Sequence, residues 1–594
     1  MANLPFTDFE KELPTILKSI EDAEFFSFDC EFSGLNKGTM AIGPFDTPQL
    51  VYQALKENVM NYLIVQIGIT AFQYLEKEQR WTYRSWSFYL FPRIPKSVRS
   101  FGNTDSLDFL SSQGFGFNKW IKQGVNYLRD ADAAYLAKEI RRRHDWKSDS
   151  LQTAARPPPR IPDAFKPKLN AILKQVQEHM QKTAAESEGQ SEPLVLRELT
   201  IAERKMVQAA LDHQYGQMLY LSRDTEVDES GHKMFTLRVN PCRSKADHTA
   251  HRKARLEEDL KAVEAARGFT RVMAAIGASA KPLVGHYIGL DLLHCIKQSA
   301  WELGGVEEDS GCFPAQALRH QAPGREPELR SLLAKAGSFS LGELRLAVNQ
   351  DSFPSIPILE AGSEYGYGED GEGHLHDAGY DSFVTGSIFI HLSRAYAQAT
   401  ASRPDSNFSF HEKSWAPCWE AVGKLGNKFT PGRVVDLPYL CLDGEEPLPD
   451  RSHVFYLESS AEAWTNTEII RLFSAWGNVN IHWCNKTAAF VALYNKKNAE
   501  TVTKQLIDDK KGLGSRGLHT VKVEGNGGPR EGRGSTVSVS VSKASTWLAL
   551  REAEGSGGRG KRGADEAGNE SGREAKANGE ATAKKRLEEP MITD

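Results

Sequence analysis

The sequence has few cysteines, no apolar run long enough to cross a membrane, and no marked excess of charge. Its seven cysteines are scattered and never spaced as CxxC, which argues against a disulfide framework and a zinc site and favours a reducing compartment. The apolar stretch at residues 62–72 is far shorter than the roughly 20 residues that a membrane helix needs. The N-terminus lacks the pattern of a secretory signal. We therefore expect a soluble intracellular protein without membrane contact.

The chain is long enough for several domains, and its net charge is small. The 594 residues correspond to three or four domains at about 150 residues each. A net charge of -5 means that a surface for nucleic acid would have to be a local basic patch. Proline-rich breaks at residues 156–160 and 447–449 indicate boundaries. From residue 526 the composition is rich in Gly, Ser, Lys and Glu, which predicts a disordered tail.

Two carboxylates near the N-terminus share one side of a predicted strand. Residues 24–31 are rich in aromatic side chains, which favours a β-strand, and Asp29 and Glu31 lie two residues apart within it. Side chains alternate along a strand, so both carboxylates point to the same face. Like charges placed together this way are unfavourable unless a cation lies between them. The alternative is an exposed strand end.

Three further polar residues lie far downstream. Asp291 follows Gly285-His-Tyr-Ile-Gly289 in the first turn of a predicted helix, where an acid is also ordinary. His376 and Asp381 are five residues apart, so they do not share one helix face. They can converge only if His376 lies in a loop and Asp381 lies on the helix that follows. The alternative is a surface histidine and an acid at a helix start.

The C-terminal part shows the order of elements found in RNA-recognition modules. Strands are predicted at residues 453–457, 479–483, 488–493 and 520–523, with helices at 467–475 and 498–507. This βαββαβ order is the ferredoxin-like pattern. Phe455 and Phe490 stand at the positions of base-stacking aromatics, although Ala488 replaces a further one. Trp483 ends a strand next to this surface, and a tryptophan there is also compatible with the core.

Together these motifs resemble the DEDDh-type 3′→5′ exonucleases, and within them the poly(A)-specific ribonucleases. The resemblance runs through Phe28-Asp-Cys-Glu-Phe-Ser-Gly-Leu35 and Ser106-Leu-Asp-Phe-Leu-Ser-Ser-Gln-Gly114. It continues through Val284-Gly-His-Tyr-Ile-Gly-Leu-Asp291 and residues 375–386, and covers roughly residues 20 to 525. Such long matches are far more specific than any single pair of acids.

The resemblance implies a role for each acid and for the histidine. Asp29, Glu31, Asp291 and Asp381 would hold two Mg²⁺ ions, one helping to generate the attacking hydroxide and the other stabilising the leaving 3′ oxygen. His376 would act as the general base. RNA would be contacted by Phe32, Arg330, Phe455 and Phe490. Trp483 would stack on the methylguanosine cap, because an electron-rich ring suits a cationic base.

Two departures from the family pattern affect secondary contacts. The family reads Gly-His-Asn where this chain has Tyr287, which puts one supporting contact in doubt but not the four acids. The family's inserted domain is named for an Arg-xxx-His motif, but Arg204 is followed at that spacing by Gln208. RNA binding by the insert therefore follows from the resemblance alone.

These observations predict an α/β protein with an RNase H-like DEDD nuclease domain, an inserted small α/β nucleic-acid-binding domain, and a C-terminal ferredoxin-like RNA-recognition module. The predicted divisions are nuclease 1–160 and 246–410, insert 161–245, linker 411–449, module 450–525 and disordered tail 526–594. The resemblance further implies a homodimeric, Mg²⁺-dependent enzyme, which we expect in nucleus and cytoplasm. It would remove mRNA poly(A) tails from the 3′ end, release 5′-AMP, and sense the 5′ cap.

Two alternatives remain open. A DEDDh nuclease of this type could trim the 3′ ends of small non-coding RNAs instead. The chain could also be a non-catalytic RNA-binding adaptor, although a retired site has no physical reason to keep buried like charges together. The sequence does not indicate target transcripts, the strength of cap stimulation or the effect of Tyr287.

Overall fold

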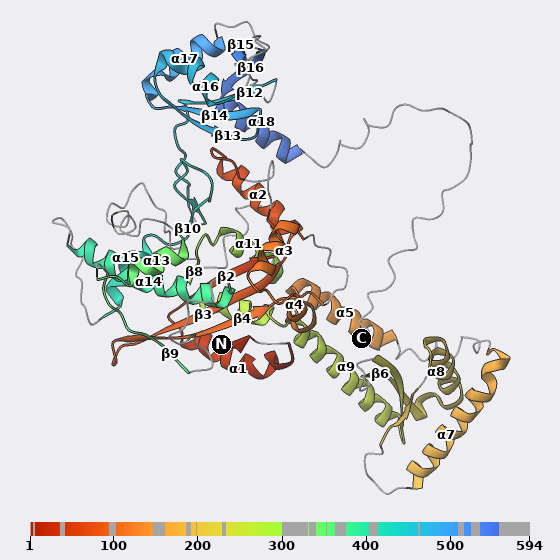
Figure 1. The fold of residues 1–594 in the computed structure, drawn as a ribbon. Helices are drawn as coiled ribbons and strands as arrows, with labels where there is room; N and C mark the ends of the chain where they lie inside the picture. The colour runs from red at the N-terminus through yellow and green to blue at the C-terminus, as the bar shows by residue number, and fades with distance from the viewer. Residues whose placement is uncertain are drawn as a thin grey trace, which may run out of the picture. The chain divides into compact units, whose positions relative to one another are not determined.

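The computed structural model describes most of the chain, with gaps. The described residues are 2–3, 6–35, 42–93, 102–146, 161–185, 192–197, 199–227, 233–299, 331, 340–351, 353–362, 367, 376–402, 414–442, 444–460, 464–508, 516–523 and 535–557. They fall in two compact units. The first is drawn from Met1–Pro92, Val98–Asn126 and Phe269–Glu580, and the second chiefly from Tyr127–Gly268 (Figure 1).

The N-terminal α/β part of the first unit is built around one mixed sheet. Its elements are β1 (Ala2–Asn3), α1 (Phe6–Asp22), β2 (Phe25–Phe32), α2 (Pro48–Asn61), β3 (Ile64–Leu75), β4 (Arg80–Tyr89), α3 (Thr104–Ser112), α4 (Phe117–Gln123), α10 (Thr270–Ser279), β8 (Leu283–Val284), α11 (Gly289–Ser299), α13 (Leu341–Val348), β9 (Ile358–Glu360), α14 (Ala378–Ala401), α15 (Ala416–Gly423), β10 (Lys428–Phe429) and β11 (Leu440–Cys441). The strand order is β1-β4-β3-β2-β8, with β9 also on β4. Strands β2, β3 and β4 are antiparallel, and β8 joins β2 in parallel. This is the mixed α/β architecture predicted from the sequence.

Helix α14 covers one face of this sheet, and its contacts form the main core. Phe25 of β2 lies edge-on to Phe389 of α14 with ring centroids 4.8 Å apart, and it stacks on Phe72 of β3 at 4.8 Å. The Ser27 hydroxyl donates to the Ser382 carbonyl at 2.6 Å. Side chains of β2 at odd positions therefore face α14, which places Asp29 and Glu31 on the same side.

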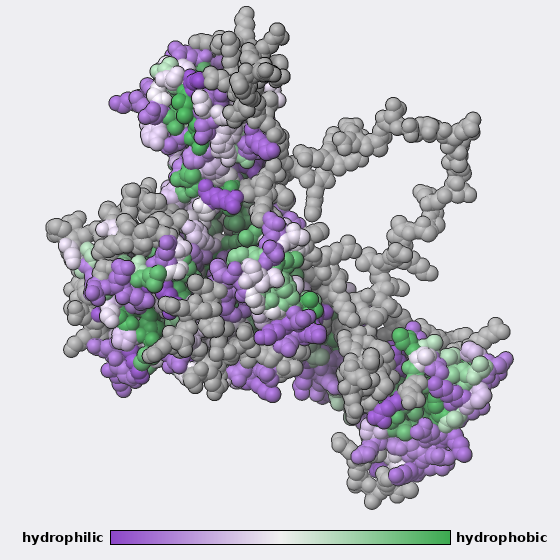
Figure 2. Space-filling view, viewed as in Figure 1, coloured by the Kyte–Doolittle hydropathy of each residue, from purple (hydrophilic) through white to green (hydrophobic). Residues whose placement is uncertain are grey.

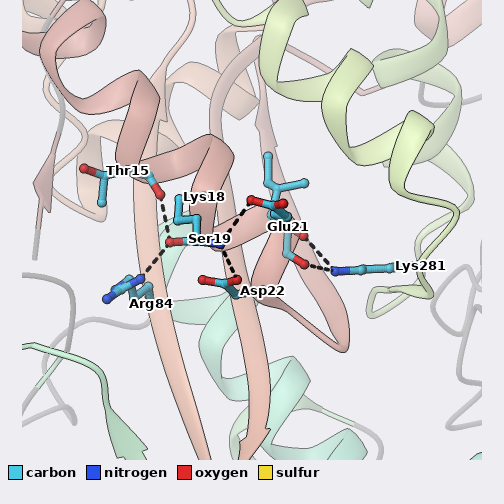
Figure 3. A network of polar contacts seen from close by, with 8 residues as sticks. Thr15, Lys18, Ser19, Glu21, Asp22, Arg84 and Lys281 are labelled. Carbon is cyan, nitrogen blue, oxygen red and sulfur yellow. Dashed lines mark hydrogen bonds and ion pairs between the residues drawn. The ribbon is translucent and has the colours of Figure 1, made fainter.

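Helix α1 is attached to the other side of the sheet by rings and by a polar network. Phe9 meets Phe88 of β4 edge-on at 6.2 Å. Arg84 of β4 donates to the Ser19 hydroxyl at 3.0 Å, and the Lys281 ammonium donates to the Ile20 and Glu21 carbonyls (Figure 3). Lys281 lies two residues before the start of β8, so these bonds hold the entry to β8 against the end of α1.

The segment predicted as a linker, 411–449, is ordered over most of its length. Helix α15 packs in the same core as α14, with Trp415 edge-on to Trp81 at 4.9 Å. Strands β10 and β11 pair with each other as an antiparallel ladder. The prediction failed because alternation is absent from two-residue strands, so this segment carries no periodic signal.

The described part of the second unit contains a three-stranded sheet and four α-helices. Its elements are α5 (Asp130–Trp146), η2 (Asp163–Phe165), α7 (Lys166–Ala185), β5 (Leu194–Leu196), α8 (Ile201–Tyr215), η3 (Gly216–Met218), β6 (Leu219–Val227), β7 (Lys233–Pro241) and α9 (Lys245–Arg267). The predicted capping box at Thr200 and Glu203 is present. The predicted boundaries 161–245 contain the sheet but leave out α5 and α9, which pack together in this unit. In place of an Arg-xxx-His pair, Gln208 accepts two hydrogen bonds from Arg223.

The C-terminal module has the predicted βαββ start and a different end. Its elements are β12 (Val454–Ser459), α16 (Asn466–Phe473), η5 (Ser474–Trp476), β13 (Val479–Trp483), β14 (Ala488–Leu493), η6 (Lys496–Asn498), α17 (Ala499–Thr503), η7 (Lys504–Asp508), β15 (Arg516–Val523), β16 (Ser535–Lys543) and α18 (Ala544–Gly557). The strand order is β13-β14-β12-β16-β15. The expected final strand at 520–523 belongs to β15, but β16 takes the place beside β12. The tail prediction from 526 is therefore wrong for residues 535–557.

Figure 2 shows hydrophilic residues over much of the coloured surface, interrupted by hydrophobic patches. Among the described residues, no helix has the length and hydropathy of a membrane span.

Candidate active site

The site begins on β2, opposite a glycine that brings a helix onto the sheet. Asp29 pairs with Gly68 of β3, and Glu31 pairs with Gln66. A Cβ added at Gly68 would lie 1.9 Å from the Ala378 carbonyl oxygen. Because Gly68 has no side chain, the first turn of α14 can sit directly on the sheet beside the two β2 carboxylates.

The start of α14 carries the predicted histidine and the fourth acid. Asp377 caps the helix, and its Oδ1 accepts from the Gly379 and Tyr380 N–H groups at 3.0 and 3.3 Å. His376 lies just before the cap with a φ of 69°, and its N–H donates to Oδ2 of Asp381 at 3.1 Å. The left-handed backbone turns the chain so that a loop histidine and a helix acid meet. The predicted loop-and-helix arrangement is therefore present.

These residues converge on one point. Ligand atoms of Glu31, His376 and Asp381 all lie within 4.8 Å of one another. Asp381 is 7% exposed, whereas the His376 side chain is exposed to solvent. One carboxylate from a strand and one from a helix thus meet a histidine that is open to an incoming molecule.

Asp291 reaches the same cluster around the edge of the sheet. Strand β8 pairs only with Phe26 and Ser27, so the edge of β2 beyond them is not covered by β8. Helix α11 begins there at Gly289, and the Asp291 carboxylate accepts hydrogen bonds from the backbone and side chain of Cys30. Asp291 is 8% exposed, and among the neighbouring charges it has the largest effect on Asp29.

Burial raises the pKa of all four acids, and neighbouring members of the group raise those of Asp29 and Glu31 further. Burial is the main cause for each. It raises the pKa of Glu31 to about 8, with added repulsion from Asp381 and Asp291. The pKa values of Asp291 and Asp381 rise to about 7, and that of Asp29 lies well above its usual range. Carboxylates crowded in this way ionise readily only when a cation shares the site.

The residues present fit a divalent cation with oxygen ligands. Oδ1 of Asp381 is buried and has no hydrogen-bond partner among the described residues, so it is available to bind a cation. Carboxylates without a thiolate in the set suit Mg²⁺ or Mn²⁺ rather than a softer metal. The donor set and the unsatisfied oxygen therefore agree with each other.

Two protein-family models match separate parts of the chain. The model of the CAF1 family ribonuclease matches residues 6–304, and that of an RNA binding domain matches residues 444–513. The first match covers half of the chain and includes Asp29, Glu31 and Asp291. This protein belongs to the CAF1 ribonuclease family.

Two curated relatives named poly(A)-specific ribonucleases match this CAF1 family ribonuclease over most of its length, and a third relative matches a shorter part. Poly(A)-specific ribonuclease PARN of Homo sapiens is 28% identical over 508 residues, which is 82% of this chain and 75% of that protein. Poly(A)-specific ribonuclease PNLDC1 of Mus musculus is 24% identical over 443 residues, 71% and 76% of the two chains. The Pre-piRNA 3'-exonuclease trimmer of Bombyx mori is 31% identical over 150 residues, 24% and 28% of the two chains.

The residues predicted to contact RNA in this CAF1 family ribonuclease differ in how far they are buried. Phe32 is half-buried and packs on His294 with ring centroids 4.7 Å apart. Phe455 is fully buried in the core between the module's sheet and its helices, so the prediction that it contacts RNA is wrong. Phe490 lies on the opposite face but is only 1% exposed. Arg330 lies outside the described residues.

Trp483 is partly exposed, on the side of the module that carries the helices. It is 37% exposed and meets Trp464 edge-on at 5.5 Å, with the rings inclined at 82°. Its Nε1–H donates to Oδ1 of Asn466 at 2.7 Å. The expected position beside the Phe490 surface is therefore corrected, because alternation along β13 turns Trp483 to the other face.

Sequence reasoning missed Phe109. This residue of α3 is 45% exposed and lies edge-on to the His376 ring at 5.2 Å. It falls within the stretch 106–114 that carries the family resemblance, which was the available signal. No chemical pattern in that stretch singles out a ring beside the histidine.

Proposed function

We propose that this protein is a 3′→5′ exoribonuclease that shortens poly(A) and releases 5′-AMP. The observation that carries the proposal is the meeting of Glu31, His376 and Asp381 within 4.8 Å. Family membership supports ribonuclease chemistry. The relatives named poly(A)-specific ribonucleases, which cover most of the chain, support poly(A) as the substrate.

Asp29, Glu31, Asp291 and Asp381 would hold two Mg²⁺ ions. Bound there, the ions would supply Lewis-acid stabilisation of the negative charge that develops on the transferring phosphate. The raised pKa values of these acids mean that they must lose protons for the ions to bind.

His376 would take the proton from the attacking water. As the new bond to phosphorus forms, the bond to the 3′-oxygen of the penultimate nucleotide breaks, and the terminal nucleotide leaves as its 5′-monophosphate. The His376 backbone is anchored on Asp381, and its ring rests against Phe109. Its exposure lets it meet a substrate that enters from solvent.

We also propose that Trp483 stacks on the methylguanosine cap. Its indole is fixed by Asn466 and Trp464, yet more than a third of the side chain stays exposed. A pre-oriented aromatic face loses little freedom when it binds a cationic base. The homodimer and the division between nucleus and cytoplasm stay proposals that rest on the family resemblance. Sedimentation of the purified protein tests the dimer.

The first experiment uses purified protein and 5′-labelled RNA ending in a 3′ oligoadenosine tail. A parallel substrate ends in mixed sequence. Each reaction is run with Mg²⁺, with EDTA, and with the Asp29→Ala variant. Asp508→Ala, which removes an exposed acid from the module, is the matched control. We expect a ladder that shortens from the 3′ end and is lost with EDTA and with Asp29→Ala only.

Other outcomes distinguish the alternatives. Equal trimming of both substrates would favour the trimming of other RNA 3′ ends, which the Bombyx mori relative motivates. Binding without shortening in any arm would refute the nuclease and support an adaptor.

A further inference from the structure

The sheet of the C-terminal module has two faces with different neighbours. Phe455 and Leu457 of β12 face the helices and form a core with Ile469 and Phe473. Tyr456 and Phe490 are cross-strand partners on the other face, with ring centroids 5.3 Å apart. Central aromatics on this face are where RNA-recognition modules stack bases.

In this chain the Tyr456–Phe490 face is covered by two aromatic rings from other segments. Trp547 of α18 stacks on Tyr456 at 4.4 Å and lies edge-on to Phe490 at 5.2 Å. Phe45, which precedes α2, lies edge-on to Phe490 at 5.2 Å and to His482 at 5.3 Å. Tyr456 and Phe490 are only 7% and 1% exposed as a result.

An ion pair joins the two covering segments. The Asp46 side chain is fully buried, and its Oδ1 accepts from Arg551 of α18 at 2.9 Å. Its Oδ2 accepts from the Gly43 N–H at 2.8 Å, which folds the segment back on itself. Thr47 contacts Glu552, the next residue of α18. A buried carboxylate is strongly disfavoured without its partner, so the two segments stay or leave together.

A third contact ties this assembly to the rest of the module. Arg451 pairs with Asp436 at 2.7 Å and donates to the Asp46 carbonyl at 3.3 Å. We call residues 43–50 together with α18 the plug. Its rings occupy the volume in which a base would stack on Tyr456 or Phe490, and they use the same aromatic contact that a base would use.

We propose that the plug competes with single-stranded RNA for the Tyr456–Phe490 face, and that the Asp46–Arg551 pair keeps the face closed. RNA bases reach the face only when residues 43–50 and α18 separate from it. The plug continues into α2, whose Asn58 and Val59 contact His294 and Lys297 of α11, the helix that carries Asp291. The closed face is therefore joined through α2 to the element that supplies one of the four acids.

The test uses the full chain in EDTA, so that binding is measured without hydrolysis and does not depend on the proposed nuclease activity. The probe is uncapped, photo-crosslinkable oligouridine. The opened variant is the double substitution Asp46→Asn with Arg551→Gln, which removes both charges without leaving either unpaired. Lys504→Gln, which removes one charge from an exposed site elsewhere in the module, is the control.

We expect little crosslinking of the peptides that contain Tyr456 and Phe490 in the wild type and in Lys504→Gln. In the double variant these peptides should crosslink, and amides of α18 should exchange hydrogen faster. A tenfold rise in the open fraction would raise the apparent affinity of this face about tenfold. Adding Phe490→Ala to the double variant should remove the gain.

Two results would overturn the proposal. Equal crosslinking of Tyr456 and Phe490 in the wild type and the double variant would mean that the face is already open. Faster α18 exchange in a folded double variant, without new crosslinks, would mean that the plug is fixed packing and that bases do not use this face.

Discussion

Neutralising one of the buried acids should stabilise the metal-free protein. The substitution Asp381→Asn tests this prediction. Asp381 is 7% exposed, and its Oδ1 lacks a partner among the described residues. Burial, with a like charge on Asp377, raises its pKa from 3.8 to about 7. An acid whose pKa is higher in the folded state than in the unfolded state does not reduce stability at a pH below its unfolded-state pKa. Stability is then lost as the pH rises from about 4 to about 7.

The size of the effect follows from the two pKa values. The interval between 3.8 and about 7 corresponds to at most about 4 kcal/mol. The four acids titrate together, so removal of one should recover only part of this, about 1–3 kcal/mol. Asparagine keeps the shape of the side chain. Its carbonyl oxygen can accept the hydrogen bond that the His376 N–H donates to Asp381.

The assay is reversible unfolding in EDTA at pH 5 and pH 8, with Asp508→Asn as an exposed control. At pH 8 we expect Asp381→Asn to raise the melting temperature by about 2–4 °C for each kcal/mol gained. The difference should shrink at pH 5. Added Mg²⁺ should stabilise the wild type more than the variant, because ligand binding to the folded state adds stability. A variant that is no more stable than the wild type at pH 8, or a gain independent of pH, would refute the electrostatic argument.

Three further predictions concern exposed groups. His376→Ala should lower the rate of hydrolysis about 10²–10⁴-fold with little change in melting temperature, because the side chain is exposed; a matching loss of stability would contradict this. Trp483→Ala should weaken binding of a cap analogue, measured by fluorescence titration, and leave the module folded. Trp464→Ala, at a buried position, should instead destabilise the module. Tyr287 has a φ of 56°, which asparagine tolerates better, so Tyr287→Asn should raise the free energy of unfolding by up to about 1 kcal/mol.

The sequence predicted the local geometry of two pairs, Asp29 with Glu31 and His376 with Asp381, because each pair lies within one short segment. Alternation along β2 places Asp29 and Glu31 on one face whatever the rest of the chain does. The five-residue interval between His376 and Asp381 excluded a shared helix face, and the structure has the loop and helix that this required. What could not be predicted was the fit of α14 onto Gly68, because it depends on two segments that are far apart in sequence.

The errors in the module have a common origin in register and composition. The sequence predicts Phe455 as a base-stacking residue, but the residues of β12 that face away from the helices are Val454 and Tyr456. A shift of one residue exchanges the two faces of a strand. The Ser–Val alternation of β16 was a strand signal, but the Gly- and charge-rich sequence around it indicated disorder. The contact of Phe45 with Phe490 joins distant segments, and neither segment predicts the other.

The arrangement of the four acids favours a working nuclease over an RNA-binding adaptor on energetic grounds. An adaptor would gain stability from a neutral side chain at any of the four positions, because each acid is destabilised by burial and three of them also by like charges. A bound cation would offset that cost with the acids ionised, and it would also use the unsatisfied oxygen of Asp381. The side chain of His376 is exposed, so it contributes little to packing. Its backbone is in the left-handed region, which is unfavourable for a residue other than glycine. A histidine with a left-handed backbone and an exposed side chain, beside buried acids of raised pKa, agrees with the general base that we propose.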